Sequence, residues 1–123
     1  MHPMTATEHG IYYVEIVAED AAAARDFYGA LYGLRFEDAA PELGNAYVAE
    51  LPGGSLFGIR ACMHASEKPV VRTYMRVKDL KQSVQQAEEL GATIALPHMA
   101  IPGHGKIAIY THGGVEQGLW QVI

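Results

Sequence analysis

The sequence is poor in cysteine and has no long apolar run, and each shortage excludes a class of protein. Cys62 is the one cysteine among 123 residues. An internal disulfide is therefore impossible, and a reducing compartment is expected. No apolar stretch approaches the roughly 20 residues that a membrane-spanning helix needs. The first ten residues, MHPMTATEHG, lack the charged and apolar segments of a secretory signal. These features predict a cytoplasmic protein without a membrane partner.

Positive charge is also scarce. Nine Lys and Arg residues stand against 14 Asp and Glu residues, which gives a net charge of −5. Proteins that bind nucleic acid normally present a basic face, so we expect no nucleic-acid partner. Half of the residues are hydrophobic and 19% are charged, which is ordinary for a globular domain. A chain of this length can build one domain with a real core, but not two independent ones.

One pattern occurs twice in the chain. In LPGGSLFGIR (51–60) and THGGVEQGLW (111–120), two glycines are followed by three residues, a third glycine and a branched aliphatic residue. Such internal repeats indicate a repeated structural unit. Three pairs of landmarks recur at nearly the same offset: Asp20 and Asp79 are 59 apart, Gly33 and Gly91 are 58 apart, and Gly58 and Gly118 are 60 apart. The sequence therefore predicts a duplicated module, with copies at about 10–64 and 69–123.

Each copy is expected to form a strand, a helix and then three strands. The first strands, 11–17 and 71–77, are rich in β-branched and aromatic residues. Asp20 and Asp79 are placed to cap the helices that follow, because Asp accepts hydrogen bonds from the free N–H groups of a first turn. The later strands are expected at 34–37, 46–51 and 55–61 in the first copy, and at 93–96, 106–110 and 118–123 in the second. The double glycines suit the hairpin turn between the last two strands of each copy.

Further motifs resemble one known family. They are D-x₆-FY in the first helix and ELGATI, IPGHGKIAIY and GLWQ in the second half. Together with the duplication, they resemble the vicinal oxygen chelate superfamily, which includes glyoxalases, bleomycin-resistance proteins and extradiol dioxygenases. The resemblance implies an α+β fold in which two βαβββ modules form half-barrel mixed sheets around a cleft, with the helices outside. It also implies a homodimer.

Metal-dependent members of that family bind their metal at four strand positions, two in each module. By resemblance these positions hold Tyr13, Gly58, Arg72 and Gly118. Divalent metals need imidazole, carboxylate or similar ligands, whereas glycine has no side chain and arginine repels cations. We therefore expect no metal and no other cofactor, and we expect the two glycines to leave room in the pocket.

Alternation along the strands predicts which side chains face the cleft, because residues two apart share a face. The predicted site contains three arginines, two glutamates, two tyrosines and a tryptophan: Tyr13, Glu15, Arg60, Arg72, Tyr74, Arg76, Glu116 and Trp120. Arginines beside aromatic rings are typical of a site for an acidic small molecule. The alternative is that Glu15 and Glu116 pair with these arginines, and that the cleft is structural or is closed by a second chain.

Three functions remain open from the sequence. The favoured one is metal-independent binding of a small acidic molecule in the cleft, with or without lyase-like or isomerase-like chemistry, and no catalytic residue is assigned. The second is a metal-dependent lyase or dioxygenase whose ligands have moved to Glu15, Glu116 and either His104 or His112. The third is a protein that sequesters a drug and catalyses no reaction.

Overall fold

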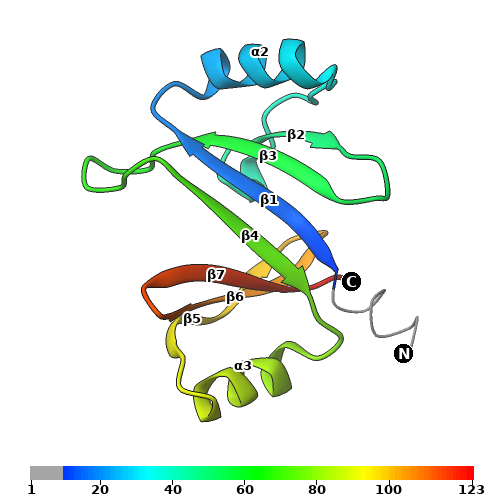
Figure 1. Cartoon of the computed structure of the whole chain (residues 1–123). Coiled ribbons are helices and arrows are strands. Elements are labelled where there is room, and N and C mark those ends of the chain that lie inside the picture. Colours follow the sequence, from blue (N-terminus) through cyan, green and yellow to red (C-terminus); the bar gives the residue numbers. More distant parts are fainter. Residues whose placement is uncertain (1–9) are drawn as a thin grey trace. The chain divides into compact units, whose positions relative to one another are not determined.

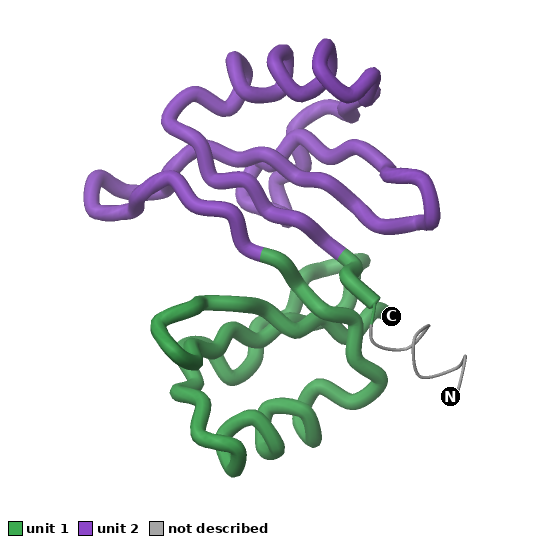
Figure 2. The backbone as a smooth tube through the Cα atoms, in the orientation of Figure 1, with its two compact units in different colours: residues 1–12, 73–123 green, residues 13–72 purple. Residues whose placement is uncertain are grey.

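The computed structural model describes residues 10–123, which form two compact units. Unit 2 is Tyr13–Arg72, and unit 1 combines Thr73–Ile123 with the residues before Tyr13 (Figure 2). Each unit carries one helix on a mixed sheet (Figure 1), so the predicted α+β class is confirmed. Within residues 10–123, none of the helices is long and apolar enough to cross a membrane.

Unit 2 is built on three strands. Its elements are β1 (Ile11–Ala18, whose first two residues belong to unit 1), α2 (Ala21–Tyr32), the 3-10 turn η1 (Pro41–Leu43), β2 (Tyr47–Glu50) and β3 (Leu56–Ala61). Strand β3 lies in the centre, parallel to β1 and antiparallel to β2. Its parallel register places Glu15 beside Gly58.

The local signals read from the sequence are confirmed in unit 2. The Asp20 carboxylate accepts a hydrogen bond from the Ala23 N–H at 3.0 Å and caps α2. Gly33 ends the helix with a φ of 67°, a left-handed conformation that glycine adopts without strain. Gly53 and Gly54 also have positive φ and form the hairpin turn between β2 and β3.

One predicted strand of the first module does not form. The segment 34–37 contributes a single backbone hydrogen bond to β2, from the Glu37 N–H to the Val48 carbonyl. Beyond it the chain makes only an isolated bridge, and Gly44 and Asn45, with φ of 69° and 61°, turn it back at once. A β-strand needs a run of residues that pair with a neighbouring strand, and the residues between α2 and β2 form no such run. The first module is therefore βαββ.

Unit 1 contains the three later strands that were expected. Its elements are β4 (Val70–Arg76, whose first three residues belong to unit 2), α3 (Leu80–Glu89), β5 (Thr93–Ile101), β6 (Gly105–His112) and β7 (Val115–Gln121). Strand β4 is parallel to β7, which is antiparallel to β6, and β6 is antiparallel to β5. The β4–β7 register places Tyr74 beside Gly118 and Arg76 beside Trp120.

The core of unit 1 lies between the sheet and the first turns of α3. Leu80 is 1% exposed and packs with Val77 and Leu119, while the Asp79 carboxylate caps the helix. The Leu80 N–H also donates to the side-chain oxygen of Gln121 at 2.8 Å, which fixes the start of α3 to β7. Because side chains alternate along a strand, Arg76 and Trp120 lie on the opposite face of this sheet.

Candidate functional site

Four charged side chains form a connected network in unit 2. Glu15 accepts hydrogen bonds from Arg60 Nε at 2.8 Å and from Arg72 Nη1 at 2.5 Å. Arg60 also donates from both terminal nitrogens to the carboxylate of Glu67, at 2.9 and 2.7 Å. The exposed fractions of these four side chains lie between 8% and 17%. Two positive and two negative charges are thus held together largely out of water.

The network favours the ionised forms of Glu67 and Arg60. The two hydrogen bonds from Arg60 lower the pKa of Glu67 from 4.5 to about 2; the Met63 N–H, which also donates to this carboxylate, contributes to the shift, and burial opposes it. The pKa of Arg60 is raised, first by the hydrogen bonds to Glu67 and also by Glu15, against the effect of burial. Glu67 was not among the predicted site residues, because its position depends on how the segment after β3 folds back.

For Glu15, the alternative left open by the sequence is the one observed. Its carboxylate pairs with both Arg60 and Arg72. Because the two glutamates balance the two arginines, the network presents no excess of positive charge. An acidic ligand at Arg72 would have to compete with Glu15 for the guanidinium.

The two repeated glycines do not leave empty space. A Cβ added to Gly58 would overlap the hydroxyl end of Tyr13, and a Cβ added to Gly118 would overlap the ring of Tyr74. Tyr13 and Tyr74 are 3% and 4% exposed. The expectation that Gly58 and Gly118 open the pocket is therefore wrong, because a tyrosine from the neighbouring parallel strand covers each of them.

The four positions that the family resemblance assigns to a metal carry an unsuitable donor set. Tyr13 and Arg72 supply a phenol and a guanidinium, and the two glycines supply no side chain. Such a set does not fit a divalent metal. Elsewhere in residues 10–123, no group of three His, Cys, Asp or Glu side chains is arranged to hold a metal ion.

Aromatic rings gather around Trp120 in unit 1. The Tyr74 ring lies 5.5 Å from the Trp120 ring in an edge-to-face arrangement, and the Tyr12 ring lies 5.2 Å away. The Trp120 Nε1–H donates to the carbonyl of His104 at 2.8 Å, and Trp120 is 2% exposed. Tyr12 was not predicted to join this cluster, because alternation in β1 placed it opposite Tyr13.

Arg76 lies beside this cluster and differs from the other two site arginines. It is paired with Trp120 in the β4–β7 register and therefore shares its face. Arg76 is exposed, and its backbone N–H donates to the Gly10 carbonyl at 2.8 Å. Within residues 10–123 its guanidinium makes no ion pair.

The remaining candidate residues of unit 1 lie apart from one another. Glu116 is exposed as the second residue of β7. His104 lies in the turn between β5 and β6, and His112 lies at the end of β6, on the helix side of the sheet, where it faces an apolar cavity. These three side chains therefore do not form a relocated metal site within the described chain.

The curated proteins to which this chain is similar carry a glyoxylase name. No protein-family model matches the chain. Proteins named "Putative glyoxylase CFP32" from Mycobacterium bovis and Mycobacterium tuberculosis are 28% identical to it over 115 residues. The alignment covers 89% of this chain but 44% of each relative. The chain thus spans less than half the length of the curated relatives it matches.

Solved structures share the fold at low sequence identity. A hypothetical protein, BH1468, from Bacillus halodurans matches with a TM-score of 0.76 at 14% identity, covering 94% of this chain and 95% of that one. Methylmalonyl-CoA epimerase from Mycobacterium tuberculosis gives 0.75 at 17% identity, covering 93% and 88%. A methylmalonyl-CoA epimerase in complex with methylmalonyl-CoA and NH4+ gives 0.69 at 15%, covering 93% and 94%. These structures confirm the predicted fold, and the curated relatives confirm the glyoxalase-like resemblance.

Proposed function

We propose that this glyoxalase-like protein binds a small acidic molecule without a metal, and that Arg76 binds the acidic group. The observation that carries the proposal is the state of the three site arginines. Arg60 and Arg72 are neutralised by glutamates, whereas the guanidinium of Arg76 has no ion-pair partner in residues 10–123. Arginine suits this task because its planar fork matches a carboxylate or phosphate with two hydrogen bonds.

Aromatic side chains beside Arg76 support an organic ligand. Tyr74 and Trp120 lie on the same face as Arg76, and Tyr12 contacts Trp120. Because Tyr74 and Trp120 are only 4% and 2% exposed, the half-buried Tyr12 ring is the one that can supply apolar surface next to the charged anchor. One protein of the same fold is seen with methylmalonyl-CoA, which carries a carboxylate. A small carboxylate is therefore the first class of ligand to test, and homodimer formation stays a prediction.

The two other functions predict different results. A metal-dependent lyase or dioxygenase would hold about one equivalent of metal and lose activity with a chelator. Glu15, one of its expected relocated ligands, is already paired with Arg60 and Arg72, which argues against it. A sequestering protein would release its ligand chemically unchanged after incubation. Mass spectrometry of bound metal and of recovered ligand separates these cases.

The proposal is tested by calorimetric titration of small carboxylates, beginning with methylmalonate, into the wild-type protein and two variants. Arg76→Ala should weaken binding about tenfold or more, because a hydrogen-bonded charge is lost from the site. Lys81→Ala removes the same charge from an exposed position on α3 and should leave the affinity unchanged. Equal losses in both variants would contradict the proposal.

A second pair of variants separates Arg76 from the network of unit 2. Arg72→Ala and Glu15→Gln each break the same buried ion pair, so both should lower the thermal midpoint. If Arg72→Ala weakens carboxylate binding more than Arg76→Ala does, while Glu15→Gln strengthens it, the acidic group binds in unit 2 and the assignment to Arg76 is wrong.

A further inference from the structure

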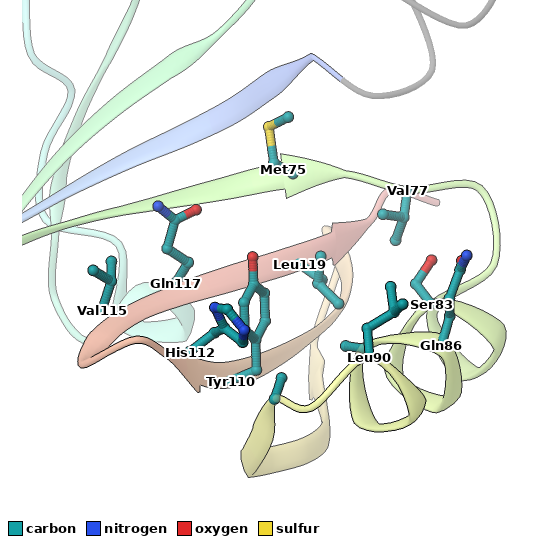
Figure 3. Close-up of a pocket in the computed structure, with 12 residues that line it drawn as sticks. Met75, Val77, Ser83, Gln86, Leu90, Tyr110, His112, Val115, Gln117 and Leu119 are labelled. Atoms are coloured by element: carbon teal, nitrogen blue, oxygen red, sulfur yellow. The ribbon is translucent and has the colours of Figure 1, made fainter.

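Unit 1 contains a cavity of about 640 Å³ between α3 and the sheet (Figure 3). Met75 of β4, Tyr110 of β6 and Leu119 of β7 line it on the sheet side, and Ala87 and Leu90 line it on the helix side. Its volume lies within the range of about 300 to 1,000 Å³ that is usual for small-molecule sites. Because Met75 and Leu119 alternate with Arg76 and Trp120, the cavity lies on the other face of this sheet from the proposed acidic site.

In the first module, aromatic rings fill the corresponding place. At the offsets of the repeat, Ala87 corresponds to Tyr28, and Gln117 corresponds to Phe57. In unit 2 the rings of Tyr28 and Phe57 pack edge to face with centroids 5.3 Å apart. In unit 1 the two smaller, ring-free side chains line the cavity instead.

A third aromatic residue is replaced in the same way. Tyr32 stacks on Tyr28 at 5.8 Å and lies 6.5 Å from Phe57, and, with Gly33 matched to Gly91, its counterpart in the second module is Leu90. Three rings of the first module thus correspond to alanine, leucine and glutamine in the second, and these three residues line the cavity. The cavity has opened where the sister module holds an aromatic cluster.

The lining shows which ligands the cavity suits. None of its 12 lining residues is Asp, Glu, Lys or Arg. Its polar groups include the Ser83 hydroxyl, the Gln86 and Gln117 amides and the His112 ring, which can each form a hydrogen bond. A charged ligand would lose its hydration here without gaining an ion pair. The lining therefore favours an uncharged molecule.

We infer that this cavity binds an uncharged aromatic small molecule, whose ring takes the place held by Tyr28 and Phe57 in the first module. The Gln117 and Gln86 amides meet polar substituents of that ligand, and Met75 and Leu119 contact its ring. The site is separate from Arg76 and does not depend on the proposed function. A second copy of the chain is the competing occupant.

The test uses N-phenyl-1-naphthylamine, an uncharged aromatic dye that becomes fluorescent in apolar sites. The wild-type protein should bind it, and the double variant Ala87→Tyr/Gln117→Phe, which restores the aromatic pair, should bind at least tenfold more weakly. Glu88→Ala alters an exposed neighbour on α3 and should bind as the wild type does. Equal binding by the filled variant, or no binding by the wild type, would overturn the inference.

A measurement on the wild type alone covers the case in which the double variant does not fold. In methyl NMR spectra, the dye should shift the signals of Met75, Val77 and Leu119 and leave Val48 and Ile59 of unit 2 unchanged. The opposite pattern would place the dye elsewhere. Sedimentation velocity tests whether a second copy of the chain is the occupant. If the wild type is a dimer that does not bind the dye, and the filled variant is a monomer, a second copy occupies the cavity.

Discussion

At the residue scale, the repeated third glycine serves to receive a tyrosine ring. The two copies reach this contact differently. In β4–β7, Tyr74 covers its direct neighbour in the register, Gly118. In β1–β3 the neighbour of Gly58 is Glu15, and the covering ring comes from Tyr13, two residues earlier. The position equivalent to Tyr74 is thereby freed in unit 2 for a carboxylate that pairs with two arginines.

We predict that Gly118→Ala lowers the free energy of unfolding by about 1–3 kcal/mol, the usual cost of forcing extra volume into a packed site. The new methyl group would displace the Tyr74 ring, which is itself held against Trp120. Urea denaturation measures the change. In a Tyr74→Ala background the same substitution should cost much less, because the obstructing ring is gone. An equal cost in both backgrounds would show that the glycine is needed for another reason.

Residue roles were predictable from the sequence where they depend on near neighbours. The caps at Asp20 and Asp79 and the turn glycines needed only local chemistry, and all are observed. The pairing of Glu15 was one of two open alternatives, because a charge pattern does not reveal which charges meet. Glu67 gave no signal at all, since its contact with Arg60 depends on the folding of the intervening loop.

At the element scale, the segment that follows β3 is fastened to that strand by one side chain. Glu67 accepts two hydrogen bonds from Arg60 and one from the Met63 N–H at 2.6 Å, and so closes the loop on itself. The segment has no regular structure of its own between β3 and β4. The Glu67 carboxylate therefore makes the side-chain hydrogen bonds that hold this segment to β3.

These hydrogen bonds predict a loss of stability in acid. Because the pKa of Glu67 is about 2 in the fold and 4.5 ordinarily, its ionised form stabilises the protein fully above pH 4.5. That contribution, on the order of 2 kcal/mol, is lost as the pH falls towards 2. Glu67→Gln should therefore be less stable than the wild type at pH 6, and the difference should shrink towards pH 2. Thermal unfolding across this range measures it.

The exposed Glu50 in the same unit provides the matched control for that experiment. Glu50→Gln should leave the pH dependence of the wild type unchanged. If Glu67→Gln also follows the wild-type curve at every pH, Glu67 does not carry the acid sensitivity.

Helices and turns with a strong local sequence pattern were predictable. Segments whose structure depends on pairing with a distant strand were not. Both helices and both hairpin turns follow from caps, apolar spacing and glycines. The segment 34–37 was predicted to be a strand, but it makes only one backbone hydrogen bond to β2. The cavity beneath α3 was also missed, although a position-by-position comparison of the two copies would have revealed the change from Tyr28 to Ala87 and from Phe57 to Gln117.

At the scale of the whole molecule, the two compact units do not coincide with consecutive halves of the chain. The boundaries fall inside β1, after Tyr12, and inside β4, after Arg72 (Figure 2). Unit 1 therefore contains the start of β1, where the Gly10 carbonyl accepts the Arg76 N–H and the Tyr12 ring contacts Trp120. The repeat explains the order of the elements, but it does not predict that the two copies exchange strand ends.

We predict that a fragment of residues 69–123 does not fold cooperatively, because it lacks the Gly10 and Tyr12 contacts of its unit and is small for an independent domain. Proton NMR should show poor dispersion for the fragment. Addition of a synthetic peptide of residues 9–18 should restore part of it, and a peptide in which alanine replaces Tyr12 should restore less. A well-dispersed spectrum from the fragment alone would refute the prediction.

The exchange of strand ends also bears on how such a chain can evolve. Once a gene has been duplicated and each product completes its fold with residues from the other copy, neither copy can be deleted by recombination without damage to both. Selection then maintains the pair as one heritable unit. Within that unit the two copies are free to differ in their side chains, as Tyr28 and Phe57 differ from Ala87 and Gln117, while both keep a helix between the first strand and the strands that follow.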